Sequence, residues 1–291
     1  MRCPQVILIA LCCASPVFAA HSFSGERALQ STARSVALGP RPSGSPAIRK
    51  LHAMILTSLR STGCQVSTDD FQAQTPEGQV AMRNILCRFP GTSGRAIVIT
   101  GHYDTKRLPG FVGANDGGSS TGFLLELARA LSGEHRTDDV IIVFFDGEEA
   151  VRDWSETDSL YGSRHLAAKW SKDGTAAKVK ALINVDMIGD KDLGILQDAN
   201  SARRLRELVW NRAGALGYGA YFQPSLSAIE DDHVPFLRLG LPALDLIDFN
   251  YGPSNSYWHT PQDTMDKLGA NSFSVVGEVI LSAIRELERQ S

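Results

Sequence analysis

Histidines and carboxylates recur at the ends of apolar segments through the middle and C-terminal parts of the chain: His102, Asp116, Glu149, Asp186 and His259. Imidazole and carboxylate groups are ordinary zinc ligands, and a catalytic zinc site keeps one coordination position for water or substrate. Each residue taken alone is weak evidence, since a lone His-x-Asp or Glu-Glu is more often a surface feature. A single buried histidine is more often satisfied by one hydrogen bond. The joint occurrence of these residues predicts a metal site.

The adjacent pair Glu148-Glu149 indicates a division of roles. Neighbouring residues near a strand end point in different directions, so Glu149 can bind a metal while Glu148 faces the reacting group. A carboxyl group that is close to a cation and partly desolvated can be tuned for proton transfer near neutral pH. Asp104, two residues past His102, is placed to accept the other ring proton of that histidine.

Short apolar runs and amphipathic patterns alternate along the chain and predict the elements that position these residues. Buried strands are expected at 95–100, 139–145, 179–185 and 241–247, an antiparallel pair at 64–72 and 80–89, and helices at 25–62 (broken at 39–44), 119–131, 160–170, 201–216, 233–239 and 272–289. The alternation predicts an α/β fold, a three-layer α/β/α sandwich around a central mixed, mostly parallel sheet. Ligands bind such sheets beyond the carboxyl ends of the strands, where the histidines and carboxylates stand.

The composition is that of an ordinary globular protein and argues against some partners. The chain has 291 residues, of which 43% are hydrophobic and 21% charged, and its net charge is −3. This is enough for one large domain, predicted over residues 21–291. Because there is no basic surplus, no nucleic-acid partner is expected. The basic pair Lys106-Arg107 is expected in a solvated loop without a functional role.

The first twenty residues have the pattern of a secretory signal peptide. Arg2 supplies positive charge, residues 6–13 are almost wholly apolar, and small residues follow, so cleavage is expected after Ala19 or Ala20. The alternative is a membrane anchor, but the apolar run is too short to span a bilayer comfortably. The mature chain is expected to be a secreted or periplasmic monomer with no membrane partner.

Two cysteines remain after the signal peptide, in a compartment that favours disulfides. Cys64 and Cys87 lie in the two segments predicted as antiparallel neighbours, on either side of a turn signal at 75–78. They are predicted to form a cross-strand disulfide, and the alternative is two buried thiols.

A series of short motifs follows the order found in one superfamily. The motifs are Gly101-His-Tyr-Asp104, Gly113-Ala-Asn-Asp116, Glu148-Glu149, Asn184-Val-Asp-Met-Ile-Gly189 and His259-Thr260. From about Asn84 to Leu268 the chain resembles the zinc aminopeptidases and the animal-type glutaminyl cyclases that share their fold. Three features resemble the cyclase branch in particular: residues 145–168, residues 229–236 and Trp258. Aminopeptidases usually have a shorter link after the glutamate pair.

The resemblance implies a metal-ligand set that depends on the branch. In a cyclase, one zinc ion would be held by Asp116, Glu149 and His259. In an aminopeptidase, a second zinc ion would be added, with His102 and Asp186 as its candidate ligands.

The cyclase resemblance also implies an activity and a catalytic group. The activity is that of a glutaminyl-peptide cyclotransferase, which converts the N-terminal Gln of a peptide to pyroglutamate and releases ammonia. Glu148 would be the general acid/base, in a hydrogen-bonded carboxylate network with Asp186 and Asp231. The partners would be the N-termini of peptides or proteins.

The glutamine pocket implied by the resemblance is formed by Trp154, Ile229 and Trp258. Each has a simpler interpretation: Trp154 as a solvent-shielding loop residue, Trp258 as packing, and Ile229 as an ordinary apolar residue at the cleft edge. Asp231 could cap the short helix that follows it. The segment 248–257 differs from the shorter animal version, which leaves its contribution to the pocket open.

Two other functions remain open at this point. A two-zinc aminopeptidase would use Glu148 as the base that activates a metal-bound water to attack the first peptide bond. A non-catalytic binding module on the same fold is disfavoured, because Glu148, Asp116 and His259 are all present.

Overall fold

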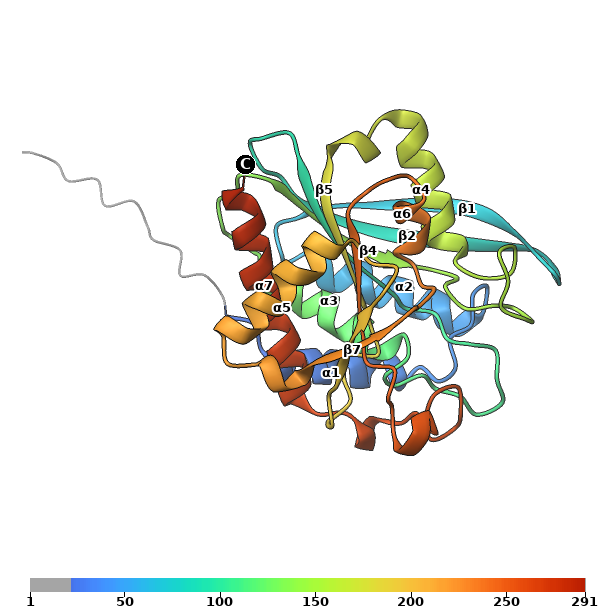
Figure 1. Ribbon diagram of the computed structural model, residues 1–291. Coiled ribbons are helices and arrows are strands. Elements are labelled where there is room, and N and C mark those ends of the chain that lie inside the picture. The colour runs from blue at the N-terminus through green and yellow to red at the C-terminus, as the bar shows by residue number, and fades with distance from the viewer. Residues whose placement is uncertain (1–21, 291) are drawn as a thin grey trace, which may run out of the picture.

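The computed structural model describes residues 22–290, so the signal-peptide prediction lies outside the described residues. Within them, eight strands form one sheet in the order β1-β2-β4-β3-β5-β8-β6-β7 (Figure 1). Their bounds are β1 Gln65–Thr75, β2 Gly78–Phe89, β3 Ala96–His102, β4 Asp139–Phe145, β5 Val179–Asp186, β6 Ile195–Asp198, β7 Phe222–Ser227 and β8 Ala243–Ile247. The central β4, β3, β5 and β8 are parallel, whereas β2 and β6 join them antiparallel. The predicted mixed sheet is confirmed.

Helices cover both faces of this sheet. They are α1 Gly25–Val36, α2 Pro46–Leu59, α3 Gly118–Ala130, α4 Tyr161–Asp173, α5 Arg203–Ala215, α6 Val234–Leu237 and α7 Ala270–Arg289, with single 3₁₀ turns at Ala176–Lys178, Gly219–Tyr221, Pro253–Asn255 and Met265–Lys267. α4 and α6 lie on one face and the other helices on the opposite face (Figure 1). Ile97 and Ile99 of β3 pack into the larger layer, whereas Val98 packs with Trp170 and Phe236 in the smaller one. This alternation along a fully buried strand produces the α/β/α sandwich.

The break predicted at 39–44 separates α1 from α2 and also supports a loop elsewhere in the fold. α2 begins after Ser45, whose side chain accepts the backbone N–H of Ile48 at 3.1 Å. Within the break, the buried guanidinium of Arg41 donates to the carbonyl oxygens of Val112 at 2.7 Å and Gly113 at 3.0 Å. Arg41 therefore fixes the loop that leads to α3.

The hairpin of β1 and β2 carries the disulfide. Cys64 and Cys87 are bonded, with their Cα atoms 5.5 Å apart, so the alternative of two free thiols is wrong. β1 begins at Gln65, and its register pairs Val66 with Cys87. The bond therefore joins β2 to the residue just before β1, rather than two residues within the strands.

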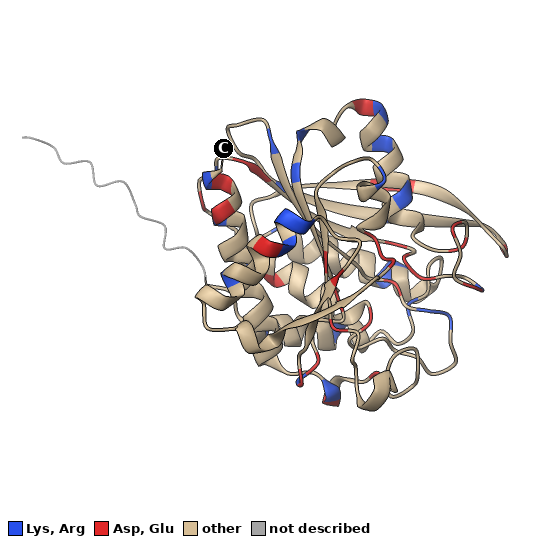
Figure 2. Cartoon of the chain, viewed as in Figure 1, with Lys and Arg blue, Asp and Glu red and all other residues tan. Residues whose placement is uncertain are grey.

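Three elements differ from the sequence prediction. β6 and β7 were not predicted, and α6 spans Val234–Leu237 rather than 233–239. β6 has only four residues, and five of the six residues of β7 are partly or fully exposed, so neither forms a long apolar run. No helix within residues 22–290 has the length and apolarity needed to cross a bilayer. The surface helices α4, α5 and α7 each carry charges of both signs (Figure 2).

Candidate active site

Chain segments that are distant in sequence meet beyond the carboxyl ends of the parallel strands. His102 ends β3 and Asp186 ends β5, while Glu148-Glu149 follows β4 after a short turn. Asp116 lies in the loop before α3, and His259 lies in the segment after β8. Because parallel strands end at the same edge of the sheet, the fold places all of these side chains together.

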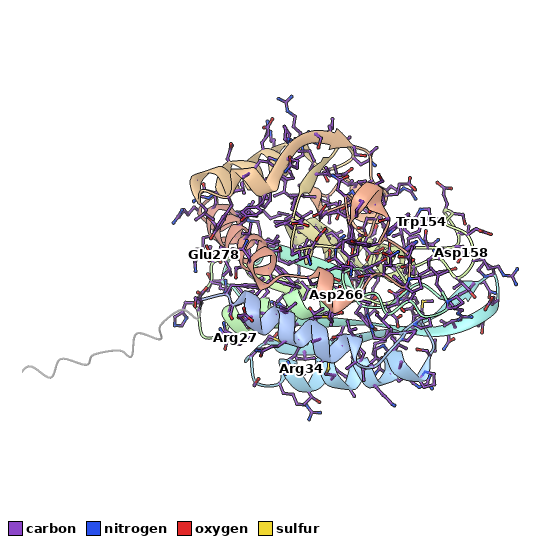
Figure 3. The ribbon with its side chains drawn as sticks, turned by 90° about the horizontal axis from the view of Figure 1, so that it is seen from below. Arg27, Arg34, Trp154, Asp158, Asp266 and Glu278 are labelled. Carbon is purple, nitrogen blue, oxygen red and sulfur yellow. A yellow bond between two sulfur atoms is a disulfide. The ribbon has the colours of Figure 1, made fainter. Side chains whose placement is uncertain are left out.

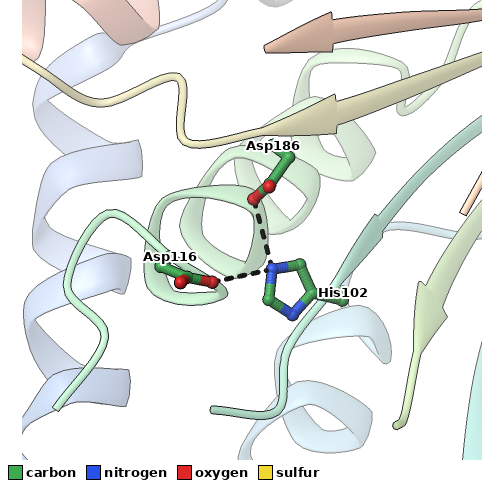
Figure 4. Close-up of side chains that lie close together, drawn as sticks. All are labelled: His102, Asp116 and Asp186. Atoms are coloured by element: carbon green, nitrogen blue, oxygen red, sulfur yellow. Dashed lines mark hydrogen bonds and ion pairs between the residues drawn. The ribbon is translucent and has the colours of Figure 1, made fainter. Parts of the chain in front are cut away.

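Asp116 lies at the centre of two groups of potential metal ligands. One oxygen of Asp116 is 3.2 Å from Nε2 of His102. The same nitrogen atom is 3.2 Å from a carboxylate oxygen of Asp186 (Figure 4). The other oxygen of Asp116 is 3.2 Å from Nε2 of His259, which is 3.1 Å from Oε1 of Glu149. Within each group, the ligand atoms all lie within 4.8 Å of one another.

The chemistry of these groups fits a divalent cation. Oδ2 of Asp116 is buried, and its polar contact among the described residues is Nε2 of His259 at 3.2 Å, whereas a buried carboxylate oxygen normally also accepts a well-formed hydrogen bond. Asp116 and Glu149 are 3% and 5% exposed. Carboxylate oxygens and imidazole nitrogens that converge in a buried place are the donor set that zinc and similar cations prefer.

The loop that carries Asp116 is held by a carboxylate that the sequence analysis did not single out. Asp263 accepts the backbone N–H groups of Asn115 at 2.8 Å and Asp116 at 3.1 Å, as well as the hydroxyl of Tyr251 at 2.8 Å. Gly117 has a φ of 77°, and a Cβ there would lie 2.2 Å from the carbonyl oxygen of Asp104. Only glycine fits that position. These contacts fix the direction of the Asp116 side chain.

Asp104 supports both the histidine and the glutamate pair. One of its oxygens lies 3.5 Å from Nδ1 of His102, the ring nitrogen opposite the ligand group, which is an ion-pair contact and not a well-formed hydrogen bond. The two oxygens of Asp104 also accept the backbone N–H groups of Glu148 at 3.2 Å and Glu149 at 3.4 Å. One buried carboxylate therefore holds the backbone of both glutamates and lies beside the ring of His102.

Glu148 has the environment of a proton carrier. Burial raises its pKa well above the ordinary value, His102 opposes this rise, and the negative charges of Glu149, Asp231 and Asp232 add to it. Asp231 also faces Asp186, and burial together with that neighbour raises the pKa of Asp231 to about 6. The carboxylates predicted to form a network are therefore close enough to influence one another.

His259 is held in an uncommon backbone conformation. Its φ of 53° lies in the left-handed region, which non-glycine residues seldom adopt and which occurs at functional sites. Burial lowers the pKa of His259, but hydrogen bonds to Asp116 and Glu149 outweigh it and raise the pKa to about 9. A cation on the same three side chains would take the place of that proton.

A cavity of about 400 Å³ opens onto the ligand group of Asp116, Glu149 and His259. Trp154, Ile229 and Trp258, the three residues expected in the pocket, all line it. Its other lining residues are Lys106, Glu148, Asp186, Ala228, Glu230, Asp231, Ile247 and Phe249. The ring of Trp258 stacks on His259 with the centroids 4.0 Å apart, so Trp258 is more than remote packing.

Two lining residues were missed by the sequence analysis. Phe249 packs edge-on against Trp258 at 4.9 Å, and it lies in the segment 248–257 whose contribution was left open. Lys106 was expected in a solvated loop, and that expectation is wrong. Its backbone N–H donates to Oε1 of Glu149 at 3.1 Å, and its Nζ lies 3.4 Å from Oε2. The sequence signal that could have identified Lys106 is its position just after β3, at the edge of the sheet where the site lies.

The segment that carries Ile229 and Asp231 is fixed by Asp198 at the end of β6. Asp198 accepts the backbone N–H of Ile229 at 2.9 Å and lies 3.0 Å from Nε2 of His233. The interpretation of Asp231 as a side-chain cap is wrong, because α6 has no side-chain cap hydrogen bond and its N-cap residue is His233.

A family match covers the strands and loops that form this site. Residues 84–284 match the profile of peptidase family M28. The chain belongs to peptidase family M28. The superfamily expected from the motifs is thereby confirmed.

The chain is also similar to animal proteins named glutaminyl-peptide cyclotransferase. It is 33% identical over 252 residues to one from Drosophila melanogaster, and this alignment covers 77% of this chain and 70% of the relative. It is 31% identical over 291 residues to one from Bos taurus, and this alignment covers 83% of this chain and 76% of the relative.

Solved structures show the same fold. An Acidobacteriales bacterium glutaminyl cyclase superposes with a TM-score of 0.90 at 42% identity, covering 96% of this chain and 99% of that one. A Zn-dependent exopeptidase from Parabacteroides distasonis superposes with a TM-score of 0.81 at 27% identity, covering 91% and 99%. The similar structures therefore include a glutaminyl cyclase and a Zn-dependent exopeptidase.

Proposed function

We propose that this M28 protein is a zinc-dependent glutaminyl-peptide cyclotransferase that acts on the N-terminal glutamine of peptides. One observation carries the proposal. The buried acid Glu148 and the group of Asp116, Glu149 and His259 line one cavity of about 400 Å³, together with aromatic and apolar side chains. A site of this kind can bind a short side chain, polarise it and move a proton.

Asp116, Glu149 and His259 would hold one zinc ion. When bound, zinc acts as a Lewis acid that polarises the γ-carboxamide carbonyl of the glutamine. Lys106 lies beside Glu149, where its charge offsets part of the negative charge of the ligand set. Asp263 and Asp104 hold the backbone of the ligand residues, so the donor atoms are already in place before substrate arrives.

The reaction that we propose is an intramolecular displacement. The free α-amine attacks the γ-carboxamide carbon, a C–N bond forms to close a five-membered lactam, and the bond to the amide nitrogen breaks. Glu148 takes a proton from the α-amine and returns it to the departing nitrogen, which leaves as ammonia. A single group can serve both steps if its pKa lies near the working pH, and burial moves the pKa of Glu148 in that direction. Asp231 and Asp186 share the charge of this network.

The pocket wall would select the substrate. Trp154, Ile229 and Trp258 would enclose the methylene groups of the glutamine side chain, and Phe249 would hold the ring of Trp258 in place. Because the α-amine must fold back onto the side chain, a wall that confines this conformer raises the fraction of productive encounters.

A two-zinc aminopeptidase is the second candidate, and one observation favours it. His102 and Asp186 form, with the shared Asp116, a second group of potential ligands whose atoms lie within 4.8 Å of one another. In that case Glu148 would be the base that activates water, and the first peptide bond would be cleaved.

The two candidates give different products from one substrate. The purified chain would be incubated with a Gln-initiated peptide, and with the matching Leu-initiated peptide as control, and the products analysed by mass spectrometry. Loss of one ammonia from the Gln peptide alone, with one zinc per chain by elemental analysis, is the expected result. Loss of a whole residue, with two zinc ions per chain, would instead establish the aminopeptidase.

We also propose that residues 1–20 are a signal peptide and that the exported chain, residues 21–291, is a monomeric single catalytic domain. The sequence pattern of the first twenty residues supports export. N-terminal sequencing of the protein recovered from an expressing culture should begin at Ala20 or His21, and its mass in solution should be that of one chain.

A further inference from the structure

The pocket wall that contains Trp154 is an exposed loop with few contacts of its own. Residues 152–157 are all exposed, and Trp154 is 40% exposed although it lines the cavity. The loop starts next to Glu149 and returns to the same place, where the N–H of Leu160 donates to the carbonyl of Glu148 at 2.8 Å. Packing alone does not determine where the indole lies.

One buried carboxylate within the loop accepts four hydrogen bonds, three of them from the backbone just before the indole. Asp158 is 3% exposed, and it accepts the backbone N–H groups of Val151 at 2.8 Å, Arg152 at 2.9 Å and Asp153 at 3.0 Å. The hydroxyl of Tyr161 donates to it at 2.7 Å. Three consecutive backbone N–H groups form a concave anion site, and the loop fills that site with its own aspartate.

Hydrogen bonds that involve Asp158 lie on both sides of Trp154 in the sequence. Asp153 directly precedes Trp154, and on the other side of the indole Asp158 donates its own backbone N–H to the carbonyl of Ser155 at 3.2 Å. Figure 3 shows Trp154 and Asp158 on the same outlying loop. The chain is therefore bonded to the carboxylate of Asp158 immediately before the indole and to the backbone N–H of the same residue immediately after it.

The contact set requires a charged acceptor. Four donors converge on two oxygens, and a carboxylate is the only side-chain group of this size that accepts on both sides. Burial raises the pKa of Asp158, but the hydrogen bonds from the hydroxyl of Tyr161 and from the backbone N–H groups lower it by more. The pKa of Asp158 therefore lies below the ordinary value. The group stays ionised at neutral pH.

We propose that Asp158 is a positioning residue that sets substrate affinity by fixing the Trp154 wall of the pocket. The proposal deepens the proposed function and rests on it for the kinetic readout. Asp158 does not touch the substrate and acts only through the indole. Loss of its charge would leave Glu148 and the ligand group unchanged and would release the loop, so the Michaelis constant would change rather than the turnover number.

The first experiment is a double-mutant cycle with the zinc-loaded enzyme. The variant Asp158→Asn keeps the shape but turns an NH₂ group toward at least one backbone N–H. It should raise KM for a Gln-initiated peptide about tenfold with kcat little changed, the equivalent of about 1.4 kcal/mol. In a Trp154→Ala background the same substitution should have no further effect. An equal rise in both backgrounds would overturn the proposal, because Asp158 would then act independently of the indole.

The matched control is Tyr161→Phe, which removes one donor to Asp158 and leaves the three backbone bonds. It should keep KM within about twofold of the parent, in line with a single hydroxyl hydrogen bond. A Tyr161→Phe variant as impaired as Asp158→Asn would contradict a role for the backbone bonds. Should Asp158→Asn fail to fold, Asp158→Ser, which retains one acceptor, takes its place in the cycle.

A second measurement does not depend on activity. Arg152 is an exposed trypsin site inside the loop, and limited proteolysis mapped by mass spectrometry reports how firmly the loop is held. Cleavage after Arg152 should be at least about fivefold faster in Asp158→Asn than in the parent or in Tyr161→Phe, while other sites keep their rates. Equal cleavage in all three would overturn the proposal even if the enzyme proved not to be a cyclase, and a failure of the cyclase assay alone would leave this result standing.

Discussion

The strand-end cluster and the pocket wall of this enzyme are held in place by different means. The ligand residues Asp116 and Glu149 are 3% and 5% exposed, and buried carboxylates on neighbouring elements fix their backbone. Trp154, in the wall, is 40% exposed and lies on a loop whose hydrogen bonds are mostly its own. The residues proposed to carry out the reaction thus lie on the rigid edge of the sheet. The residues proposed to recognise the substrate lie on loops that can vary without moving the reacting residues. Substitutions in the two regions should therefore affect different kinetic constants.

The largest expected effect comes from removing a ligand of the cluster. His259→Ala leaves Asp116 and Glu149 without their shared imidazole, so zinc should be lost and kcat/KM should fall by about a thousandfold or more. Elemental analysis and steady-state kinetics measure the two losses. A variant that retains one zinc ion and its activity would show that the metal lies elsewhere.

Glu148→Gln should separate proton transfer from metal binding within the same cluster. The amide is similar in size but cannot carry the proton, so kcat should fall by about 10² to 10⁴-fold while the zinc content stays at the parent value. The measurement pairs kinetics with elemental analysis. Retained turnover in this variant would rule out Glu148 as the acid/base.

A wall substitution should give the opposite kinetic pattern. Phe249→Ala removes the edge-on contact with Trp258, which should raise KM by about fivefold with kcat and zinc content little changed. Leu226→Ala, at an exposed apolar residue of β7, is the matched control and should have no effect. A large fall in kcat for Phe249→Ala would mean that wall and cluster are not separable.

The last prediction concerns the free energy of unfolding and not catalysis. Asp198 holds the Ile229 segment, and although burial opposes it, hydrogen bonds from His233 and other donors lower its pKa from 3.8 to about 2. A lowered folded-state pKa means that the charged form stabilises the fold above about pH 4, and that this contribution, about 2 kcal/mol, is lost as the pH falls toward 2.

Urea unfolding of metal-free protein between pH 6 and pH 2.5 measures this contribution. The parent should lose more stability across pH 4 to 2.5 than Asp198→Asn, which cannot titrate at that position. Parallel curves for the two proteins would show that the Asp198 contacts make no net contribution to folding.

Much of the cluster could be predicted because its signals are local in sequence. Short apolar runs gave the four central strands, and the polar residues that directly follow them, such as His102 and Asp186, had to lie at one edge of the sheet. β6 and β7 were not predicted because short or exposed strands at the side of a sheet lack an apolar run. Asp263 was missed for a related reason, since its partners Asn115 and Asp116 are far away in the sequence.

The sequence by itself determined the β1–β2 pair, the four central strands and the main helices, the cysteine pair and the residue types that could bind zinc. It determined these because hydrophobic periodicity and ligand chemistry are properties of short segments. Only the tertiary structure decided that Asp116 lies between two ligand groups, that Lys106 faces Glu149, and that Asp158 holds the Trp154 loop. Such contacts depend on side-chain directions in the folded chain, and no pattern of residue types encodes those directions.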